Sequence, residues 1–170
     1  EAMIGINTAM APIGILLAGI FIPRLSYIFG AKRVAIFMAA TTGVIFLLYP
    51  TFPSLWAWFP LRLLQGMTVA TLFALSEAWV LGNANGAYRG RVVGIYATCI
   101  SATFGVGAAV VSITGIEGYL PFAVGAAVLF LAILPISLVG KAADGHRDHP
   151  HVSMLSFLPK APMLLIAIVV

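Results

Sequence analysis

Charged side chains are scarce in this chain of 170 residues, and their scarcity excludes a water-soluble fold. Asp, Glu, Lys and Arg together make up 8% of the residues, whereas hydrophobic residues make up 62%. A typical soluble domain is about one quarter charged, because polar side chains must cover its surface. The composition therefore indicates a protein that lies within a lipid bilayer.

Cysteine is almost absent as well. Cys99 is the single one, which excludes a disulfide framework and a thiolate metal site. Nine lysines and arginines give a net charge of +4, but they lie scattered between apolar runs instead of clustering with aromatic residues, which excludes a nucleic-acid interface. There is no glycine-rich phosphate loop, nucleophile elbow or zinc-binding helix motif. We therefore predict neither an enzyme nor a cofactor.

What the sequence does contain is a series of long apolar runs. A helix needs about 20 mostly apolar residues to cross the hydrocarbon core of a bilayer. Barrel strands would alternate apolar and polar residues, whereas these runs are apolar on every face. The sequence predicts an all-α membrane protein with five complete spans and the start of a sixth, over 3–22, 34–49, 54–81, 92–116, 118–140 and 161–170.

The basic residues predict how the chain is oriented. Eight of the nine lie in the first, third and fifth connections between spans, and the two opposite connections hold none. Because cytoplasmic loops carry an excess of Lys and Arg, we expect the loops 23–33, 82–91 and 141–160 to be cytoplasmic and Glu1 to lie on the outer side. The eight residues are Arg24, Lys32, Arg33, Arg89, Arg91, Lys141, Arg147 and Lys160.

Two of the connections between spans have a distinctive composition, one basic and the other rich in proline and aromatic residues. Pro23 and Arg24 begin a stretch that ends at Lys32 and Arg33, and we expect a short basic turn over this stretch. On the opposite side, prolines and aromatic residues indicate an interfacial turn with an aromatic belt. These residues are Pro50, Phe52, Pro53, Trp56, Trp58 and Phe59.

Three short motifs resemble those of the major facilitator superfamily. The first is the signature loop G-x-L-a-D-R-x-G-R-R, matched by Gly19, Pro23, Arg24, Gly30, Lys32 and Arg33, with Pro23 in place of the acidic residue and a longer spacing. The second is R-x-x-Q-G, matched by Arg62, Gln65 and Gly66. The third is R-G-R, matched by Arg89, Gly90 and Arg91. The Pro-Arg variant, together with Ser76-Glu77-Ala78-Trp79, looks most like a YcaD-like bacterial branch.

The resemblance implies a fold and an activity. Residues 1–140 would hold helices two to six, 141–160 the central cytoplasmic loop, and 161–170 the start of helix seven of a longer carrier. Helix one and helices eight to twelve would be its remaining partners. The implied activity is secondary active transport of a small solute by alternating access, in a bacterial inner membrane, with a coupling proton left open. The alternative is a transport-inactive sensing or structural protein, favoured by Pro23.

Arg62 and Glu77 are the only ionisable residues within the spans, and charges in the membrane are costly, which makes them functional candidates. With Gln65 they fall along one helical stripe that we expect to face a substrate path. If the helix begins near Ser54, Arg62 lies deep; if it begins at Pro60, Arg62 snorkels to the surface. The resemblance favours the deep position.

Glu77 lies near the predicted cytoplasmic end of its helix. We expect it to pair with Arg24, Arg89 or Arg91 in a cytoplasmic gate that opens as the two halves rock. The alternative is an interfacial carboxylate with no role in gating.

Small residues predict where helices pack closely. Gly66 is one, and Ser101, Gly105 and Ala109 form a stripe in the next span. The superfamily's antiporter motif ends this helix with Gly-Pro, but Gly107 is followed by alanine, so antiport is not supported and symport and uniport stay open.

Three histidines, His146, His149 and His151, follow in a loop with Asp144 and Asp148. We interpret this segment as a solvated linker and not a metal site. Expressed alone, the 170 residues are expected to insert but neither bind nor move a substrate.

Overall fold

The computed structural model describes residues 2–52, 54–84, 86–115 and 118–138, and every regular element among them is an α-helix. The five helices are α1 (Ala2–Phe29), α2 (Ala31–Thr51), α3 (Leu55–Gly82), α4 (Arg89–Thr114) and α5 (Leu120–Leu138). The predicted all-α class is confirmed. The predicted central loop 141–160, with its histidines, and the start of the sixth span at 161–170 lie outside the described residues.

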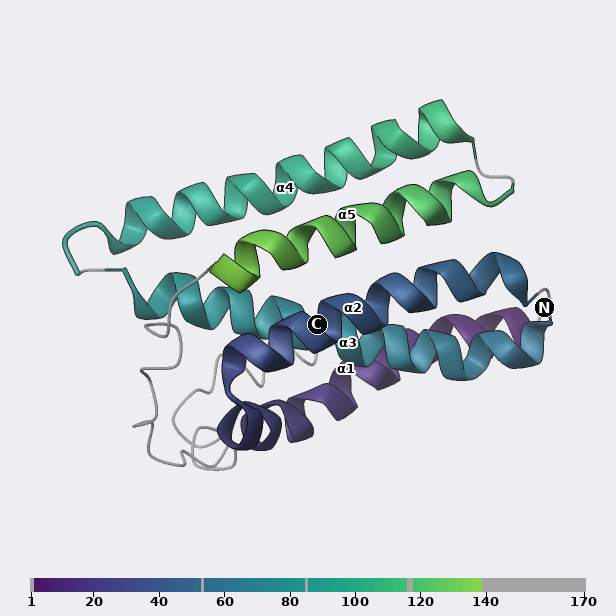
Figure 1. The fold of residues 1–170 in the computed structure, drawn as a ribbon, viewed down its shortest axis with the longest axis horizontal. Helices are drawn as coiled ribbons and strands as arrows, with labels where there is room; N and C mark the ends of the chain where they lie inside the picture. Colours follow the sequence, from purple (N-terminus) through teal and green to yellow (C-terminus); the bar gives the residue numbers. More distant parts are fainter. Residues whose placement is uncertain (1, 53, 85, 116–117, 139–170) are drawn as a thin grey trace.

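All five described helices are long and apolar enough to cross a membrane. They run back and forth along one direction, so that successive connections lie at alternate ends of the bundle (Figure 1). Helices are favoured because lipid offers the backbone no hydrogen-bond partners, and a helix satisfies its own N–H and C=O groups. The chain is an integral membrane protein.

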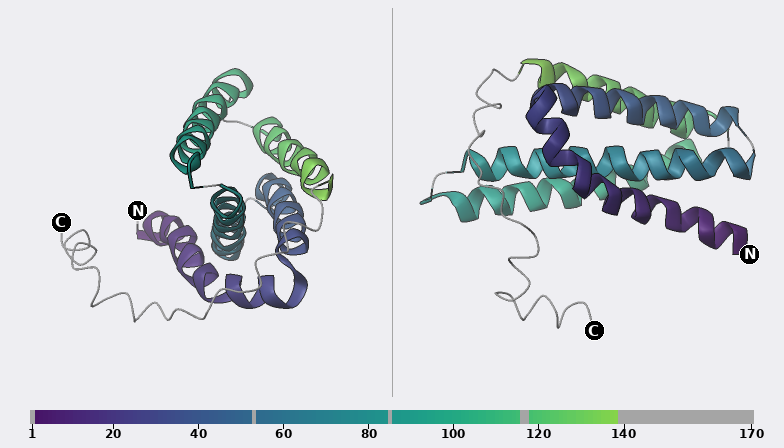
Figure 2. Two further views of the ribbon diagram at one scale, coloured as in Figure 1. Left: turned by 90° about the vertical axis from the view of Figure 1, so that its left-hand side faces the viewer. Right: turned by 90° about the horizontal axis from the view of Figure 1, so that it is seen from below.

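The closest helix packing joins α1 to α3, which run in the same direction (Figure 2). A Cβ added at Gly66 would overlap the carbonyl oxygen of Ala11, and one added at Gly14 would overlap that of Leu63. Two glycines therefore allow the backbones to touch, as small residues do in membrane helix pairs. Successive α1 residues on this face are one turn apart, at Asn7, Ala11, Gly14 and Ala18.

A second pair, α2 and α5, packs aromatic rings over glycines. The ring of Phe130 lies over Gly43, and the ring of Phe46 lies over Gly125. On the other side α4 stands at the edge of the bundle, and none of its residues is buried (Figure 2). The predicted packing stripe of Ser101, Gly105 and Ala109 is exposed here, with no neighbour close to Gly105, so its role stays a prediction.

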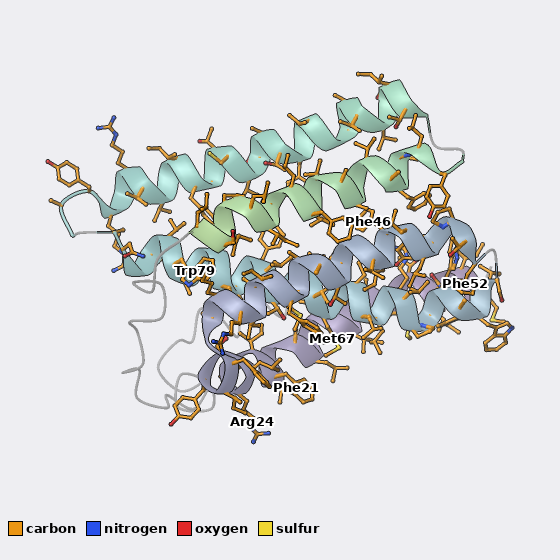
Figure 3. The ribbon with its side chains drawn as sticks, in the orientation of Figure 1. Phe21, Arg24, Phe46, Phe52, Met67 and Trp79 are labelled. Atoms are coloured by element: carbon orange, nitrogen blue, oxygen red, sulfur yellow. The ribbon has the colours of Figure 1, made fainter. Side chains whose placement is uncertain are left out.

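The predicted basic turn at 23–33 is wrong in its extent. The helix α1 continues through Pro23 and Arg24 to Phe29, and only Gly30, with φ 82°, separates it from α2. Instead of ending, α1 bends, so that its last turns, which carry Arg24, run across the end of the bundle (Figures 2 and 3). Proline removes one backbone N–H and bends a helix, and in a membrane helix the bend is tolerated because breaking the helix would expose more unpaired groups.

The helix that carries Arg62 begins at Leu55, with Ser54 preceding it, and Pro60 lies inside it. The alternative helix start at Pro60 is therefore wrong. Aromatic residues do gather at this end of the bundle. Trp58 packs edge-on against Tyr49, with ring centroids 5.8 Å apart, and its indole N–H donates to the Phe52 carbonyl over 2.8 Å.

Candidate functional site

Arg62 is the eighth residue of α3, which places it about 10 Å along the axis from the start of the helix at 1.5 Å per residue. Its side chain is half-buried. The Nε atom is enclosed and has no hydrogen-bond partner. A cation in this position is energetically costly without a partner. Arg62 is therefore the central residue of the candidate functional site.

Two neutral side chains lie beside Arg62. The Tyr49 hydroxyl, on α2, donates to Gln65 Oε1, on α3, over 2.6 Å. Tyr49 is only 6% exposed, held by Ile45, Leu61 and the aromatic rings around it. The Arg62 guanidinium lies close enough for its charge to act on the Tyr49 hydroxyl. Gln65 of the R-x-x-Q-G segment is thus tied to α2, and the Arg62 charge lies near that bond.

A fourth polar side chain comes from α1. Asn7 is 5% exposed, and its Nδ2 has no hydrogen-bond partner. It lies four residues before Ala11, which touches Gly66, and Arg62 lies four residues before Gly66. Because α1 and α3 run in the same direction (Figure 2), Asn7 and Arg62 both lie before the crossing of the two helices, within about two helical turns of it. We call Asn7, Tyr49, Arg62 and Gln65 the polar cluster.

Glu77 is not part of the polar cluster. It lies 15 positions beyond Arg62 on α3, about 22 Å along the axis, and its side chain is exposed. Among the residues that the structure describes, no ion pair joins it to Arg24, Arg89 or Arg91. The structure therefore separates the two ionisable residues of the predicted stripe, and the gate remains a prediction.

Gln65 and two further residues on this side of α3, Gly66 and Ser76, contact different helices. Gly66 meets α1, Gln65 meets α2, and the Ser76 hydroxyl lies 2.9 Å from the Tyr96 hydroxyl of α4. A single helical face of α3 therefore touches three neighbours in turn. The stripe does not line one continuous cavity in this arrangement.

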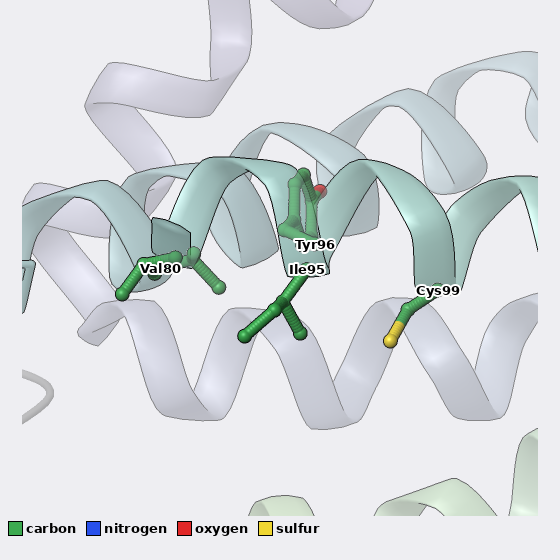
Figure 4. Close-up of a pocket in the computed structure, with 5 residues that line it drawn as sticks. Val80, Ile95, Tyr96 and Cys99 are labelled. Carbon is green, nitrogen blue, oxygen red and sulfur yellow. The ribbon is translucent and has the colours of Figure 1, made fainter. Parts of the chain in front are cut away.

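Two shallow grooves lie elsewhere. The first, about 380 Å³, runs between the end of α3 and the start of α4, and Val80, Ile95 and Cys99 line it (Figure 4). The second, about 460 Å³, lies between α2, α3 and α5, beside Leu72 and Trp79. Both are almost wholly apolar, and neither includes a residue of the polar cluster.

The basic residues gather at the end of the bundle opposite the aromatic belt, where α1, α3 and α5 end and α2 and α4 begin (Figure 1). Arg24, Arg33, Arg89 and Arg91 are exposed there. The Lys32 ammonium donates to the Ser137 carbonyl over 2.6 Å and so ties the start of α2 to the end of α5. This is the favoured place for a cation, because the last carbonyls of a helix carry partial negative charge.

Comparison with protein families gives one match. The model described as Major Facilitator Superfamily matches residues 1–170, the whole length of the sequence. The chain belongs to the Major Facilitator Superfamily. No curated protein and no solved structure matches the chain. Superfamily members are transporters that sit in the lipid bilayer and bind small molecules, so membership confirms the expected class of protein.

Within this facilitator, the sequence motifs identified only half of the polar cluster. Arg62 and Gln65 belong to R-x-x-Q-G, but Asn7 and Tyr49 belong to no motif and were not predicted. Asn7 could have been found from its polarity, because it is the only side-chain amide between Met3 and Ile22, a run that is otherwise apolar except for one threonine. Tyr49 gave no such signal, because a tyrosine near the end of a span is expected in any aromatic belt.

Proposed function

We propose that this facilitator is a secondary active carrier that moves a small solute by alternating access, with the polar cluster on the substrate path. The observation that supports the proposal is the enclosed, unpartnered Nε of Arg62 within the bundle. Charged residues inside a membrane are expensive and mark substrate or ion pathways. Substrate and coupling-ion sites of carriers lie near the bilayer midplane, where such a group can contact them.

The arrangement of the chain in the membrane is part of the proposal. Helices α1 to α5 would be helices two to six of the carrier, of the YcaD-like branch, in a bacterial inner membrane. The basic end of the bundle would face the cytoplasm. There the exposed arginines and Glu77 would meet the other half of the carrier and act as a gate. The gate residues would be Gly19, Pro23, Arg24, Gly30, Lys32, Arg33, Arg89 and Arg91.

Transport by the full-length protein in proteoliposomes tests the function. A panel of labelled solutes would be offered under pH and sodium gradients, and uptake under at least one gradient is expected. Arg62→Gln should reduce that uptake about tenfold or more, because the cation that fixes the solute is lost. Leu64→Ala is the matched control, since Leu64 lies two residues away on α3 and is 45% exposed. It should transport as the parent does.

The opposite results favour the transport-inactive alternative. That alternative expects no flux with any solute or gradient, and it expects Arg62 and Glu77 to be replaceable by neutral residues without loss of function. Flux that ignores every gradient and is unchanged in Arg62→Gln would contradict the proposed coupling.

A further inference from the structure

Two enclosed donors on the packed helices α1 and α3 have no hydrogen-bond partner. Asn7 Nδ2, on α1, and Arg62 Nε, on α3, are buried and lack hydrogen-bond partners. An unpaired buried polar group loses its hydration without compensation, which costs about 1–3 kcal/mol and more when the group is charged. Two such groups, on facing helices and on the same side of their crossing, indicate a position that a bound acceptor fills.

The acceptor does not come from the part of the chain that the structure describes. Glu77 is the only acidic residue there, and it lies about 22 Å along α3 from Arg62. Within the polar cluster, Gln65 Oε1 already receives the Tyr49 hydroxyl over 2.6 Å. With its oxygen engaged, the Gln65 amide has its NH₂ left to offer, which is a further donor. The polar cluster therefore holds one positive charge and several N–H donors, and no negative charge.

We infer that the polar cluster binds an anionic oxygen group, a carboxylate or a phosphate, carried by the solute. This inference rests on the proposed transport function and specifies its substrate class. A guanidinium and an amide N–H match such a group, because charge-assisted hydrogen bonds to carboxylate or phosphate oxygens are short and strong. The apolar residues around Tyr49 exclude water and strengthen the attraction.

The reactivity of a cysteine placed in the polar cluster reports the electrostatic potential there, and the measurement does not require the solute to be known. Asn7→Cys would be made in the full-length protein with Cys99→Ala, so that the only reactive thiol of the 170 residues is at position 7. Its reaction with an anionic reagent, 2-sulfonatoethyl methanethiosulfonate, is compared with that of the cationic 2-trimethylammonioethyl analogue. Each rate is divided by the rate with a free thiol in solution.

The expected result is that the anionic reagent reacts about tenfold faster than the cationic one, because a buried cation concentrates anions. Arg62→Gln should abolish this preference. Lys141→Gln, which removes one positive charge outside the proposed gate, is the control and should retain it. Equal normalised rates, or a preference that survives Arg62→Gln, would overturn the inference.

A measurement on the unsubstituted protein does not depend on the cysteine variant folding. The thermal midpoint of the purified full-length protein would be recorded with sodium propionate, with inorganic phosphate and with neutral propionamide at equal ionic strength. A midpoint raised by propionate indicates a carboxylate solute, and one raised by phosphate indicates a phosphorylated solute. An equal rise with propionamide, or no rise with either anion, contradicts the inference.

The outcomes separate the binding site from the transport function. A reagent preference without solute flux retains the anion site and overturns the transport proposal. Flux without any preference retains transport and overturns the anion site.

Discussion

Among single residues, Gly66 has the tightest surroundings. A Cβ there would overlap the Ala11 carbonyl oxygen and lie 3.0 Å from the Ala11 Cα, both backbone atoms of α1 that cannot rotate away. We expect Gly66→Ala to destabilise the fold by about 1–3 kcal/mol, the usual range for overpacking. The change should be measured as the free energy of unfolding of the full-length protein in mixed detergent micelles.

The control for Gly66→Ala is Gly5→Ala. Gly5 lies on α1 as well, and nothing lies within 4 Å of the position that its Cβ would occupy. Its substitution should change stability by less than about 0.5 kcal/mol. Equal effects of the two substitutions would show that α1 and α3 do not touch at Gly66.

The hydrogen bond between Tyr49 and Gln65 is a second residue-level test. Tyr49→Phe removes the donor and should cost about 1 kcal/mol, since hydrogen bonds between membrane helices average less than 2 kcal/mol. A double-mutant cycle with Gln65→Leu, read from the same unfolding assay, isolates the pair. The control is Tyr27→Phe, because Tyr27 is 80% exposed on α1. A coupling energy near zero would mean that the bond is absent from the membrane-embedded protein.

The sequence predicted Arg62 and Gln65 of the polar cluster and missed Asn7 and Tyr49. Arg62 stands out because a charge inside an apolar run is rare and costly. Asn7 and Tyr49 are uncharged, so a search of the apolar runs for charged residues does not identify them. Their relevance comes from the packing of α1 and α2 against α3, which is a property of the tertiary structure.

At the level of the helices, the lengths of the apolar runs predicted the positions of the spans well. Proline residues, in contrast, were poor predictors of where the helices begin and end. The observed α4 and α5 begin and end within a few residues of the predicted runs. Pro23 and Pro60, in contrast, lie inside helices. In water a proline usually ends a helix, but in lipid every broken backbone hydrogen bond is more costly, so the helix bends instead.

Gly30 is the residue that does separate two helices. Its φ of 82° and ψ of 140° lie in a region that residues with a Cβ rarely adopt. Gly30→Ala should therefore destabilise the fold by about 1–3 kcal/mol and displace the bent end of α1. Gly94→Ala is the matched control, because Gly94 is inside α4 with open space around it.

The displacement can be read separately from the stability. A distance between spin labels at Tyr27 and Phe37, both exposed, should change in Gly30→Ala and stay constant in Gly94→Ala. An unchanged distance together with unchanged stability would mean that the connection tolerates a side chain and that glycine is not required there.

For the whole molecule, the sorting of charge predicts which end faces the cytoplasm. The exposed arginines lie at one end of the bundle and the aromatic belt lies at the other (Figure 3). Loops rich in Lys and Arg stay on the cytoplasmic side during insertion, whereas tryptophan and tyrosine occur at both interfaces. The arginines therefore decide the orientation, and the aromatic belt only marks the depth of the interface.

Labelling from one side of the membrane tests that orientation. Single cysteines at Gly86 and Ser54, both exposed and at opposite ends of the bundle, would be introduced with Cys99→Ala. A membrane-impermeant maleimide should label Ser54→Cys in right-side-out vesicles and Gly86→Cys only in inside-out vesicles. The reverse pattern would place the basic end outside, against the direction that the positive charges favour. It would also move Arg24, Arg89 and Arg91 to the outer face, so that the proposed gate would control entry from outside.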